Sequence, residues 1–589
     1  MPRHSSLFRS LLPGSCFVLA SFAPAASAQF VFVGPASDPA CNYHTIQEAV
    51  DAWAASTSTD FVDVVIANSQ TYSATAITIP TPVASTGLSL RGDLPTCHLG
   101  AATGHTVLNG SGNGNLPVID INGTVAGDTR RPQINLLYLD ITGGQHAGGN
   151  GGGVRLRGNA VVTVFETKIH GNSAAYGGGI SVEATAAGLP NLIIVGNQVP
   201  GSIQDNHATQ DGGGLYCANA TLNCDHYCLV ANNSAIGNGG GIAQQTCTTT
   251  FSPPNSTGPR DPNVGLRLNS AGGDGGGAWV SGGYLDVNSA TPQKPAPIVG
   301  NVAGGNGGGL YYTGFGSSSS AQRGVQFDDN QAGGDGGALY ADSGSFQFYA
   351  GGFAGCGQDV NGCPRFRGNH ADLAGGAIAM SGTASAIVSE VMFSNNDAGH
   401  ASVMQVGGAS GVTLINSHIA GNHGASELLR SSGAYIDLRY VTIADNGSDD
   451  DALIRFDVAG GFATSNSILY DANGPASGVV LAAPAGTTLH MDCVLVHDDS
   501  GLAGAPGVSG LIVADPQWDT SGLYQAGVYV PGPDSPAADA CGPGPGTIPD
   551  MLGGARPRDL PKPDGAGAYD MGAIERLPDD IFGNGFEQP

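Results

Sequence analysis

The sequence has very little positive charge. Only three lysines, Lys168, Lys294 and Lys562, occur in 589 residues, and the formal net charge is −27. A surface this acidic repels nucleic acid and anionic lipid headgroups. We therefore expect neither nucleic acid nor an anionic membrane surface as a partner.

Long hydrophobic runs are also missing. No stretch offers the ~18 uninterrupted apolar residues that a membrane-spanning helix needs. The apolar run Leu11 to Phe22 is shorter, follows Arg3 and Arg9, and precedes the small residues Ala26-Ser27-Ala28. This order is typical of a secretory signal peptide over residues 1–28. We expect a secreted protein without a membrane span, extracellular or on the outer-membrane surface of a Gram-negative bacterium, and a monomer.

Cysteine is scarce, and export would leave an even number of them. The chain has 11 cysteines, and Cys16 lies in the predicted signal peptide. An oxidising exterior favours disulfides. We predict pairing of Cys356 with Cys363 across a short loop, and a staple between Cys41 and Cys97. For the cluster Cys217, Cys224, Cys228 and Cys247 we favour two local disulfides over a zinc site that would include His226.

Glycine, in contrast, is abundant, with 95 residues, and its placement is periodic. A Gly triplet or Gly-Gly-Ala recurs, each time followed by an apolar residue. The triplets begin at Gly151, Gly177, Gly212, Gly239, Gly275, Gly307, Gly336 and Gly375. Upstream of most triplets an apolar residue is followed three positions later by asparagine. These asparagines are Asn172, Asn206, Asn233, Asn269, Asn301, Asn330, Asn369, Asn396, Asn422 and Asn446.

The period is about 30 residues, which indicates a solenoid or similar array. Apolar and variable positions alternate after each glycine triplet, as in a short strand with one buried face. Asn and Gly also tolerate the left-handed backbone that tight corners need. The sequence therefore predicts an all-β fold, a right-handed single-stranded parallel β-helix (a pectate-lyase-like solenoid), with the asparagines stacked in a structural ladder.

The ends of the solenoid differ from its repeats. Thr45 and Glu48 form a capping-box pattern, which predicts a helix that caps the first coil. Pro and Gly crowd residues 531–568, a loop-rich composition. We expect these segments: signal peptide 1–28, N-terminal cap 29–60, parallel β-helix 61–515, closing segment 516–575 and flexible tail 576–589.

One column of outward positions carries aromatic residues. Trp279, Tyr311 and Tyr340 follow inward-facing residues on three consecutive coils, and Tyr216 extends the column beyond Ala243. A strip of exposed rings is typical of a binding surface, and we expect it to bind a neutral glycan. The alternative is that the rings stack on one another and only stabilise the sheet.

No cofactor is expected, apart from a weak calcium candidate. The residue before the glycine triplet alternates between Asp and Asn, with Asp274 and Asp335 two coils apart. We favour a neutral turn ladder here over a calcium site between these two carboxylates.

Two functions of different classes remain open. The first is an adhesin-like or glycan-binding protein without defined catalysis, whose partner is a polysaccharide or a host or cell-surface glycan. The second is an extracellular polysaccharide lyase or glycoside hydrolase acting on a cell-wall or matrix polysaccharide, by analogy of fold alone.

The sequence gives the enzyme hypothesis little support, and we assign no catalytic residue. Lys168 and Arg323 are available as lyase bases, but no constellation singles them out. Asp328-Asp329 is a lone fragment of a hydrolase pattern. His146, His207 and His370 sit at turn positions, which favours solvated turn residues. We expect that the chain is not an enzyme.

Two families resemble parts of this sequence. The elements Gly336–Leu339 and Gly375–Ile378, together with Phe-x-x-Asn at Phe327, Phe366 and Phe393, resemble the repeats of polymorphic outer-membrane proteins over residues 145–450. That resemblance implies an autotransporter adhesin. Residues 515–575 resemble the choice-of-anchor Q proteins, which implies an exported β-helix with no defined reaction. This second resemblance rests on Asp515-Pro516, Ser535 to Asp539, Gly553 to Arg556 and Asp570 to Glu575. The ending Ile581 to Glu587 is either a sorting signal or a disordered leftover.

Overall fold

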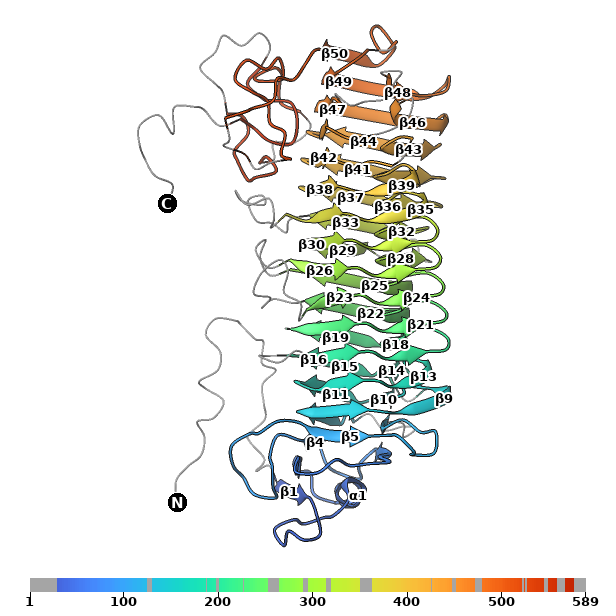
Figure 1. Cartoon of the computed structure of the whole chain (residues 1–589), viewed down its shortest axis with the longest axis vertical. Helices are drawn as coiled ribbons and strands as arrows, with labels where there is room; N and C mark the ends of the chain where they lie inside the picture. The colour runs from blue at the N-terminus through green and yellow to red at the C-terminus, as the bar shows by residue number, and fades with distance from the viewer. Residues whose placement is uncertain are drawn as a thin grey trace, which may run out of the picture.

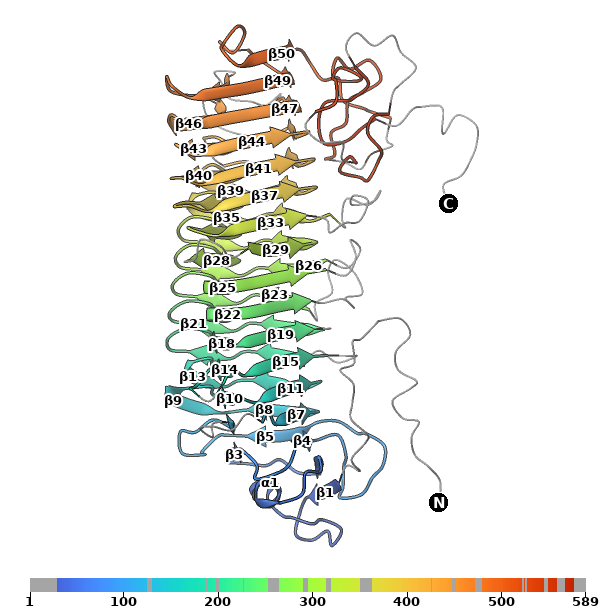
Figure 2. The same cartoon turned by 180° about the vertical axis from the view of Figure 1, so that it is seen from behind.

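The protein forms one long rod of stacked coils (Figures 1 and 2). The computed structural model describes residues 29–576 except for 124–129, 187, 197–200, 226, 253–263, 290–294, 314–318, 350–362, 425, 448–451, 472–478, 500, 522–523, 525–526, 545–548 and 559–566. The predicted signal peptide, His226, Cys356 and residues 577–589 lie outside the described residues. The N-terminal coils form one end of the rod and strands β47 to β50 the other.

Each coil crosses up to four faces, which we name A, B, C and D, and every coil-to-coil pairing of strands in register is parallel. Face A consists of β3 (Ile77–Pro80), β6 (Ile119–Gly123), β10 (Val154–Gly158), β14 (Ile180–Glu183), β18 (Leu215–Ala218), β28 (Leu310–Thr313), β32 (Leu339–Ala341), β36 (Ile378–Met380), β40 (Met404–Gly407), β43 (Leu429–Ser432), β46 (Ala452–Val458) and β48 (Val479–Ala482). Face B consists of β1 (Gln29–Val33), β2 (Val62–Ile66), β4 (Gly87–Arg91), β7 (Gln133–Leu137), β11 (Val161–Phe165), β15 (Asn191–Val195), β19 (Thr221–Asp225), β29 (Ser319–Arg323), β33 (Ser345–Tyr349), β37 (Ser385–Ser389), β41 (Gly411–Ile415) and β44 (Tyr435–Arg439).

Face C consists of β5 (Thr106–Asn109), β8 (Leu139–Thr142), β12 (Lys168–His170), β16 (Gly201–Gln204), β20 (Cys228–Ala231), β23 (Gly265–Arg267), β26 (Ala296–Val299), β30 (Val325–Asp328), β34 (Arg365–Arg367), β38 (Met392–Ser394), β42 (His418–Ala420) and β45 (Thr442–Ala444). Two long strands, β22 (Ile242–Ser252) and β25 (Ala278–Asn288), cover faces A and B, and β47 (Gly461–Leu469), β49 (Thr488–Val496) and β50 (Val508–Val513) cover faces B and C. Face D is a sheet of nine short strands: β9 (Gln145–Asn150), β13 (Ser173–Tyr176), β17 (His207–Ala208), β21 (Ser234–Ala235), β24 (Ser270–Ala271), β27 (Val302–Ala303), β31 (Gln331–Ala332), β35 (His370–Ala374) and β39 (Asp397–His400). The predicted parallel β-helix is confirmed.

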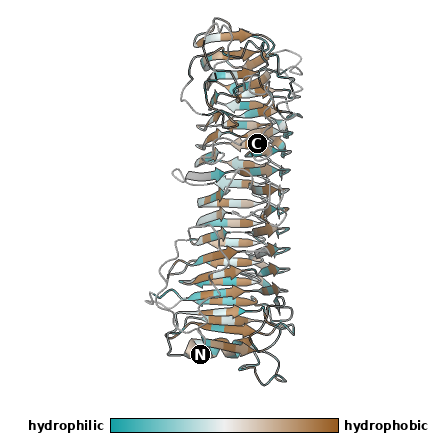
Figure 3. Cartoon of the chain, turned by 90° about the vertical axis from the view of Figure 1, so that its left-hand side faces the viewer, coloured by the Kyte–Doolittle hydropathy of each residue, from teal (hydrophilic) through white to brown (hydrophobic). Residues whose placement is uncertain are grey.

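The core of the rod comes from the alternation of side chains. The apolar residue after each glycine triplet points inward on consecutive coils and is almost fully buried, from Val154 to Ile378. Figure 3 shows hydrophobic segments recurring in successive strands along the rod. Inside the core the rings of Phe327, Phe366 and Phe393 stack in parallel, with centroids 4.7 and 5.1 Å apart. The Phe-x-x-Asn repeat is therefore an internal aromatic stack.

The ten asparagines lie in one buried column at the corner between faces C and D. In a typical step, Asn330 Oδ1 accepts hydrogen bonds from both the backbone N (3.1 Å) and Nδ2 (2.9 Å) of Asn301. Asn301 Nδ2 also donates to the carbonyl of Leu266 at 3.0 Å. From Asn172 to Asn422 each side chain thus joins three coils and satisfies backbone groups that the corner leaves without a strand partner.

The left-handed backbone occurs one residue earlier than we expected. The asparagines themselves do not have positive φ; the residue before each asparagine does. These residues are Gly171, Asp205, Asn232, Leu268, Gly300, Asp329, Gly368, Asn395, Gly421 and Asp445, with φ between 49° and 70°. The reason is geometric: the left-handed residue makes the turn, and the turn aims the next side chain into the rod.

The glycine triplets form the corner between faces D and A. The first glycine of every triplet has positive φ, for example 69° at Gly275. A Cβ on the second glycine, Gly276, would overlap the backbone carbonyls of Val302 and Gly308 on the next coil. The triplet therefore serves both the sharp turn and the close approach of successive coils.

A helix caps the N-terminal end, as predicted. α1 (Ile46–Ala55) begins with a capping box in which Thr45 and Glu48 satisfy each other's backbone N–H groups. Val50 and Trp53 are buried against the first coils. The predicted staple Cys41–Cys97 is present.

The other cysteines among the described residues also form disulfides. Cys217 pairs with Cys247 and Cys224 with Cys228, so the two local disulfides are confirmed and the zinc interpretation is wrong. Cys363 is disulfide-bonded, although its predicted partner, Cys356, lies outside the described residues.

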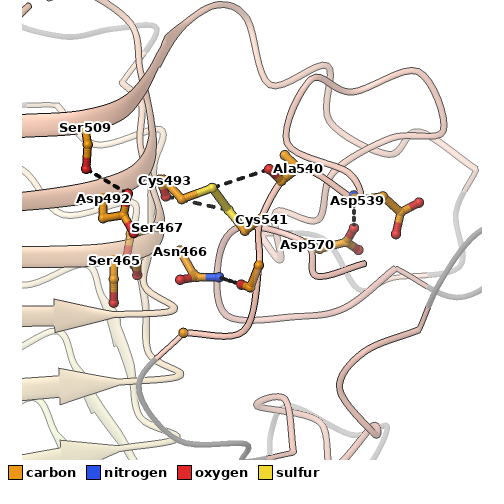
Figure 4. Close-up of a disulfide and its surroundings, with 12 residues drawn as sticks. Ser465, Asn466, Ser467, Asp492, Cys493, Ser509, Asp539, Ala540, Cys541 and Asp570 are labelled. Atoms are coloured by element: carbon orange, nitrogen blue, oxygen red, sulfur yellow. Dashed lines mark hydrogen bonds between the residues drawn. A yellow bond between two sulfur atoms is a disulfide. The ribbon is translucent and has the colours of Figure 1, made fainter. Parts of the chain in front are cut away.

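The closing segment folds back along the side of the rod. We call its described residues between 516 and 576 the clasp. Four successive corner residues between faces B and C hold the clasp. Asn416 donates to the carbonyl of Pro549, and Tyr440 accepts from the backbone N of Gly544. Asn466 donates to the carbonyl of Gly542, and Cys493 forms a disulfide with Cys541 (Figure 4). Beneath the clasp, outward positions on face C are buried, among them His418, Thr442, Ile468 and Leu495.

Candidate functional site: the aromatic window on face A

The aromatic column lies on face A in the expected register. Trp279 on β25 pairs with Tyr311 on β28, which pairs with Tyr340 on β32. All three side chains are half-buried on the outer surface. The column continues as predicted through Ala243 to Tyr216 on β18.

Two rings of the column stack on each other. The centroids of Tyr311 and Tyr340 are 5.1 Å apart and their planes differ by 8°. In this arrangement each ring covers one face of the other, so the ring edges and hydroxyls are the groups left to face solvent. The stacking that we weighed as part of the alternative is therefore present for this pair.

Tyr216 does not belong to an exposed strip. Its side chain is buried, with 8% of the residue exposed, and its ring lies 5.0 Å from that of Tyr176. Burial raises the pKa of Tyr216 to about 12 and that of Tyr311 to about 12. The expectation of outward exposure was wrong for Tyr216 because the preceding turn contributes a second tyrosine that covers it.

A second outward column runs beside the rings, two residues further along each strand. Ser281 and Thr313 pair in register, and Asp342 follows on the next coil, where its backbone N bonds the carbonyl of Tyr312. Thr313 Oγ1 donates to Asp342 Oδ2 at 2.8 Å. The hydroxyl of Tyr340 is bonded to Ser381 Oγ at 2.9 Å. We define the face A window as Trp279, Ser281, Tyr311, Thr313, Tyr340 and Asp342.

The window is almost free of charge. From β22 to β40 the two columns contain Ala243, Gln245, Trp279, Ser281, Tyr311, Thr313, Tyr340, Asp342, Ala379, Ser381, Gln405 and Gly407. Asp342 is the one ionisable acid or base among these twelve apart from the two tyrosines. In a chain of net charge −27 this is a local exception.

Ion pairs border the window at both ends. On the N-terminal side Arg157 contacts Asp120 at 2.8 Å, and Arg155 lies 3.8 Å from Glu183.

On the C-terminal side Arg430 contacts Asp457 at 2.7 Å and Glu427 at 3.5 Å, and Arg455 lies 3.8 Å from Glu427. Sequence reasoning missed these belts because their residues are far apart in the chain. The signal was present in the register, since Arg430 and Arg455 occupy the same column as the rings.

The weak calcium candidates are not brought together. Asn306 lies between Asp274 and Asp335: Asp274 Oδ1 accepts from the backbone N of Asn306 at 2.7 Å, and Asn306 Oδ1 accepts from that of Asp335 at 2.8 Å. These bonds make the alternating Asp/Asn column a second ladder. Within the described ranges, one group of side chains has metal-ligand spacing, Asp38 with Cys41 and Cys97, and its two cysteines are bonded to each other.

The residues considered for catalysis lie apart. Lys168 is on face C, Arg323 on face B, and His146, His207 and His370 on face D. Asp328 is buried in a bidentate contact with Arg365, while Asp329 makes a left-handed corner. These side chains therefore lie on different faces of the rod and do not form a common site.

Membrane-spanning helices are not found in the part of the chain that the structure describes. Residues 324–342 match the Chlamydia polymorphic membrane protein repeat. This stretch contains β30, the ladder residue Asn330, the triplet beginning at Gly336 and the window residue Tyr340. No curated protein matches the chain. The resemblance of the closing segment to choice-of-anchor Q proteins is not confirmed. The chain is thus a parallel β-solenoid that carries a repeat similar to that of the polymorphic membrane proteins.

Proposed function

We propose that this chain is an adhesin-like protein, exposed on or released from a bacterial surface, that binds uncharged glycan through the face A window. The observation that carries the proposal is that the window, in which Asp342 is the one carboxylate, lies between two belts of ion pairs. Hydroxyl, amide and aromatic groups are the usual partners of neutral sugars, and an acidic protein that bound polyanions would need unpaired cations instead. The matched repeat supports surface exposure, since it is named for membrane proteins.

The test compares binding to a glycan array with thermal melting. The triple substitution of Trp279, Tyr311 and Tyr340 by Ser should abolish binding to neutral glycans. Because the Tyr311–Tyr340 stack also stabilises the sheet, the gentler pair Tyr311→Phe and Tyr340→Phe keeps the stack and removes only the hydroxyls. We expect this pair to weaken binding with little change in melting temperature.

A matched control is Tyr435→Ser, which removes an outward tyrosine from face B, 45% exposed and away from the window. It should leave binding intact. Lost stability with unchanged binding in the triple variant would show that the column only packs. Release of shorter sugars during the binding assay would instead favour the lyase or hydrolase alternative.

A further inference from the structure

We infer that the glycan bound by the face A window is a linear, uncharged polysaccharide in extended conformation, of the β-(1→4)-linked hexose class, lying along the rod with one sugar per coil. The inference rests on the proposed function and adds the class, direction and register of the ligand. Three features of the window carry it.

The first feature is that a similar pair of side chains, one aromatic and one polar, occurs on three consecutive coils. Each coil presents an aromatic residue and, two residues later, a polar residue with an oxygen: Trp279 with Ser281, Tyr311 with Thr313, and Tyr340 with Asp342. The strand register places all three pairs one above another. A surface that repeats by translation along its axis is complementary to a ligand that repeats by translation along its own axis.

The second feature is the length of the repeat. The stacked rings of Tyr311 and Tyr340 are 5.1 Å apart, close to the ~4.8 Å spacing of paired strands. An extended β-(1→4)-linked hexose chain advances by about the same distance per sugar. Successive sugars, which alternate in orientation along such a chain, would therefore each meet one aromatic ring and one polar oxygen on successive coils, whereas helical α-linked chains and branched glycans would lose register after one coil.

The third feature is that the polar atoms already point along the rod. Thr313 donates to Asp342 on the next coil, and Tyr340 is bonded to Ser381 on the coil after its own. These bonds fix the side chains before a ligand arrives, which lowers the entropy cost of binding.

The pattern also has definite ends. Ala243 and Ala379 occupy the ring column on either side of the three pairs, and both are buried. The Arg155–Glu183 and Arg430–Asp457 pairs follow further out. Three or four sugars should therefore make most of the contact, and longer chains should add little.

The experiment is calorimetric titration of the exported full chain with cello- and chito-oligosaccharides of two, four and six sugars. We expect the affinity to rise at least tenfold from two to four sugars and less than threefold from four to six. Polygalacturonate and a branched α-mannan serve as charged and non-linear probes and should bind at least tenfold more weakly than the hexamers.

Breaking the middle pair tests the register. Tyr311→Ser should lower hexamer affinity to the level of the dimer, and Tyr435→Ser on face B should not. If Tyr311→Ser proves poorly folded, Tyr311→Phe takes its place because it keeps the ring stack. We expect Tyr311→Phe to cause an intermediate loss of hexamer affinity. Binding of neutral glycans without dependence on length, or a preference for the branched mannan, would overturn the inference but leave the proposed function. Binding to none of the neutral glycans would overturn both.

Discussion

The central coils and the last coils of the rod use different residues at the corner between faces D and A. In the central coils the corner between faces D and A is made of glycine, and a Cβ at its second position would overlap the next coil, as at Gly276. In the last coils the same register position is taken by Ser402 and then by the buried Glu427. Face D ends at β39.

The clasp begins to cover face C where the glycine corners stop. From β42 onward the outward positions of face C are buried beneath residues such as Met571 and Ala573. The tight glycine corner is thus specific to the central coils, and contacts to a segment distant in sequence are specific to the last coils. We therefore expect the loss of stability caused by a substitution to depend on whether it lies in the central coils or in the last coils.

The largest effect is expected at the residue that joins the clasp to the rod. Arg556 is buried, donates to Glu575 Oε1 (2.9 Å), the carbonyl of Gly572 (2.8 Å) and Asn416 Oδ1 (3.2 Å), and lies 4.2 Å from the ring centre of Tyr440. Arg556→Met leaves these acceptors without a donor and should cost about 3–5 kcal/mol.

Hydrogen exchange would measure this loss, which should be confined to the clasp and the last coils. Arg558→Met, a half-buried arginine of the same segment, is the control and should cost far less. An equal loss of protection in the central coils would contradict the idea that the clasp stabilises only the last coils.

The next effect concerns the glycine corner. Gly276→Ala forces a Cβ against the backbone of the next coil and should cost about 3 kcal/mol, the upper end for overpacking. At the matching C-terminal position the native residue, Ser402, already carries a Cβ, so Ser402→Ala only removes a buried hydroxyl without a hydrogen-bond partner and should be nearly neutral. Urea unfolding of the two variants checks the difference, and similar costs would show that the two corners pack alike.

A smaller effect is expected from pH. Burial, reinforced by Asp570, raises the pKa of Glu575 to about 8 from an ordinary 4.5. The folded clasp therefore holds this proton more tightly than the unfolded chain, so the free energy of unfolding falls as pH rises from 4.5 to about 8 and is level above it. Calorimetry should show the clasp melting earlier at pH 8 than at pH 5. Glu575→Gln should flatten the trend, whereas Glu183→Gln on face A should not.

The smallest effect is a gain in stability. Leu268 occupies a left-handed corner at φ 53° that equivalent coils fill with Gly, Asn or Asp, and it is 61% exposed. Leu268→Asn should stabilise the rod by about 1 kcal/mol because a branched side chain is disfavoured there. The control is Ile236→Asn, a similarly exposed apolar residue without positive φ. An equal gain in both variants would assign the effect to lost surface hydrophobicity.

The repeats could be predicted from sequence because one physical requirement returns in every coil. The inward column, the asparagine ladder and the capping box at Thr45 each leave a local, periodic signal. The clasp leaves none of this kind. Its only local trace is that outward positions such as Ile468 and Leu495 become apolar, which alternation alone cannot separate from a wider core.

The candidate site was partly predictable for the same reason. Register alone placed Trp279, Tyr311 and Tyr340 in one column, but the stacking of Tyr311 on Tyr340 depends on ring rotation, which no pattern encodes. The burial of Tyr216 depends on Tyr176 in a neighbouring turn. Arg576, which we expected to be the first residue of the flexible tail, is buried and lies 3.7 Å from Asp519.

The disulfide between Cys493 and Cys541 also has a mechanical consequence. Once the non-covalent contacts of the residues after Cys541 are broken, a pull on that part of the chain reaches the rod through a covalent bond at β49 and bypasses residues 494–540. The terminal strand β50, which has a paired neighbour on one side only among the described strands, then carries no tension. A stack of coils normally unravels from its free edge, one strand at a time. Here the load is delivered inside the stack, where β49 is flanked on both sides by β47 and β50.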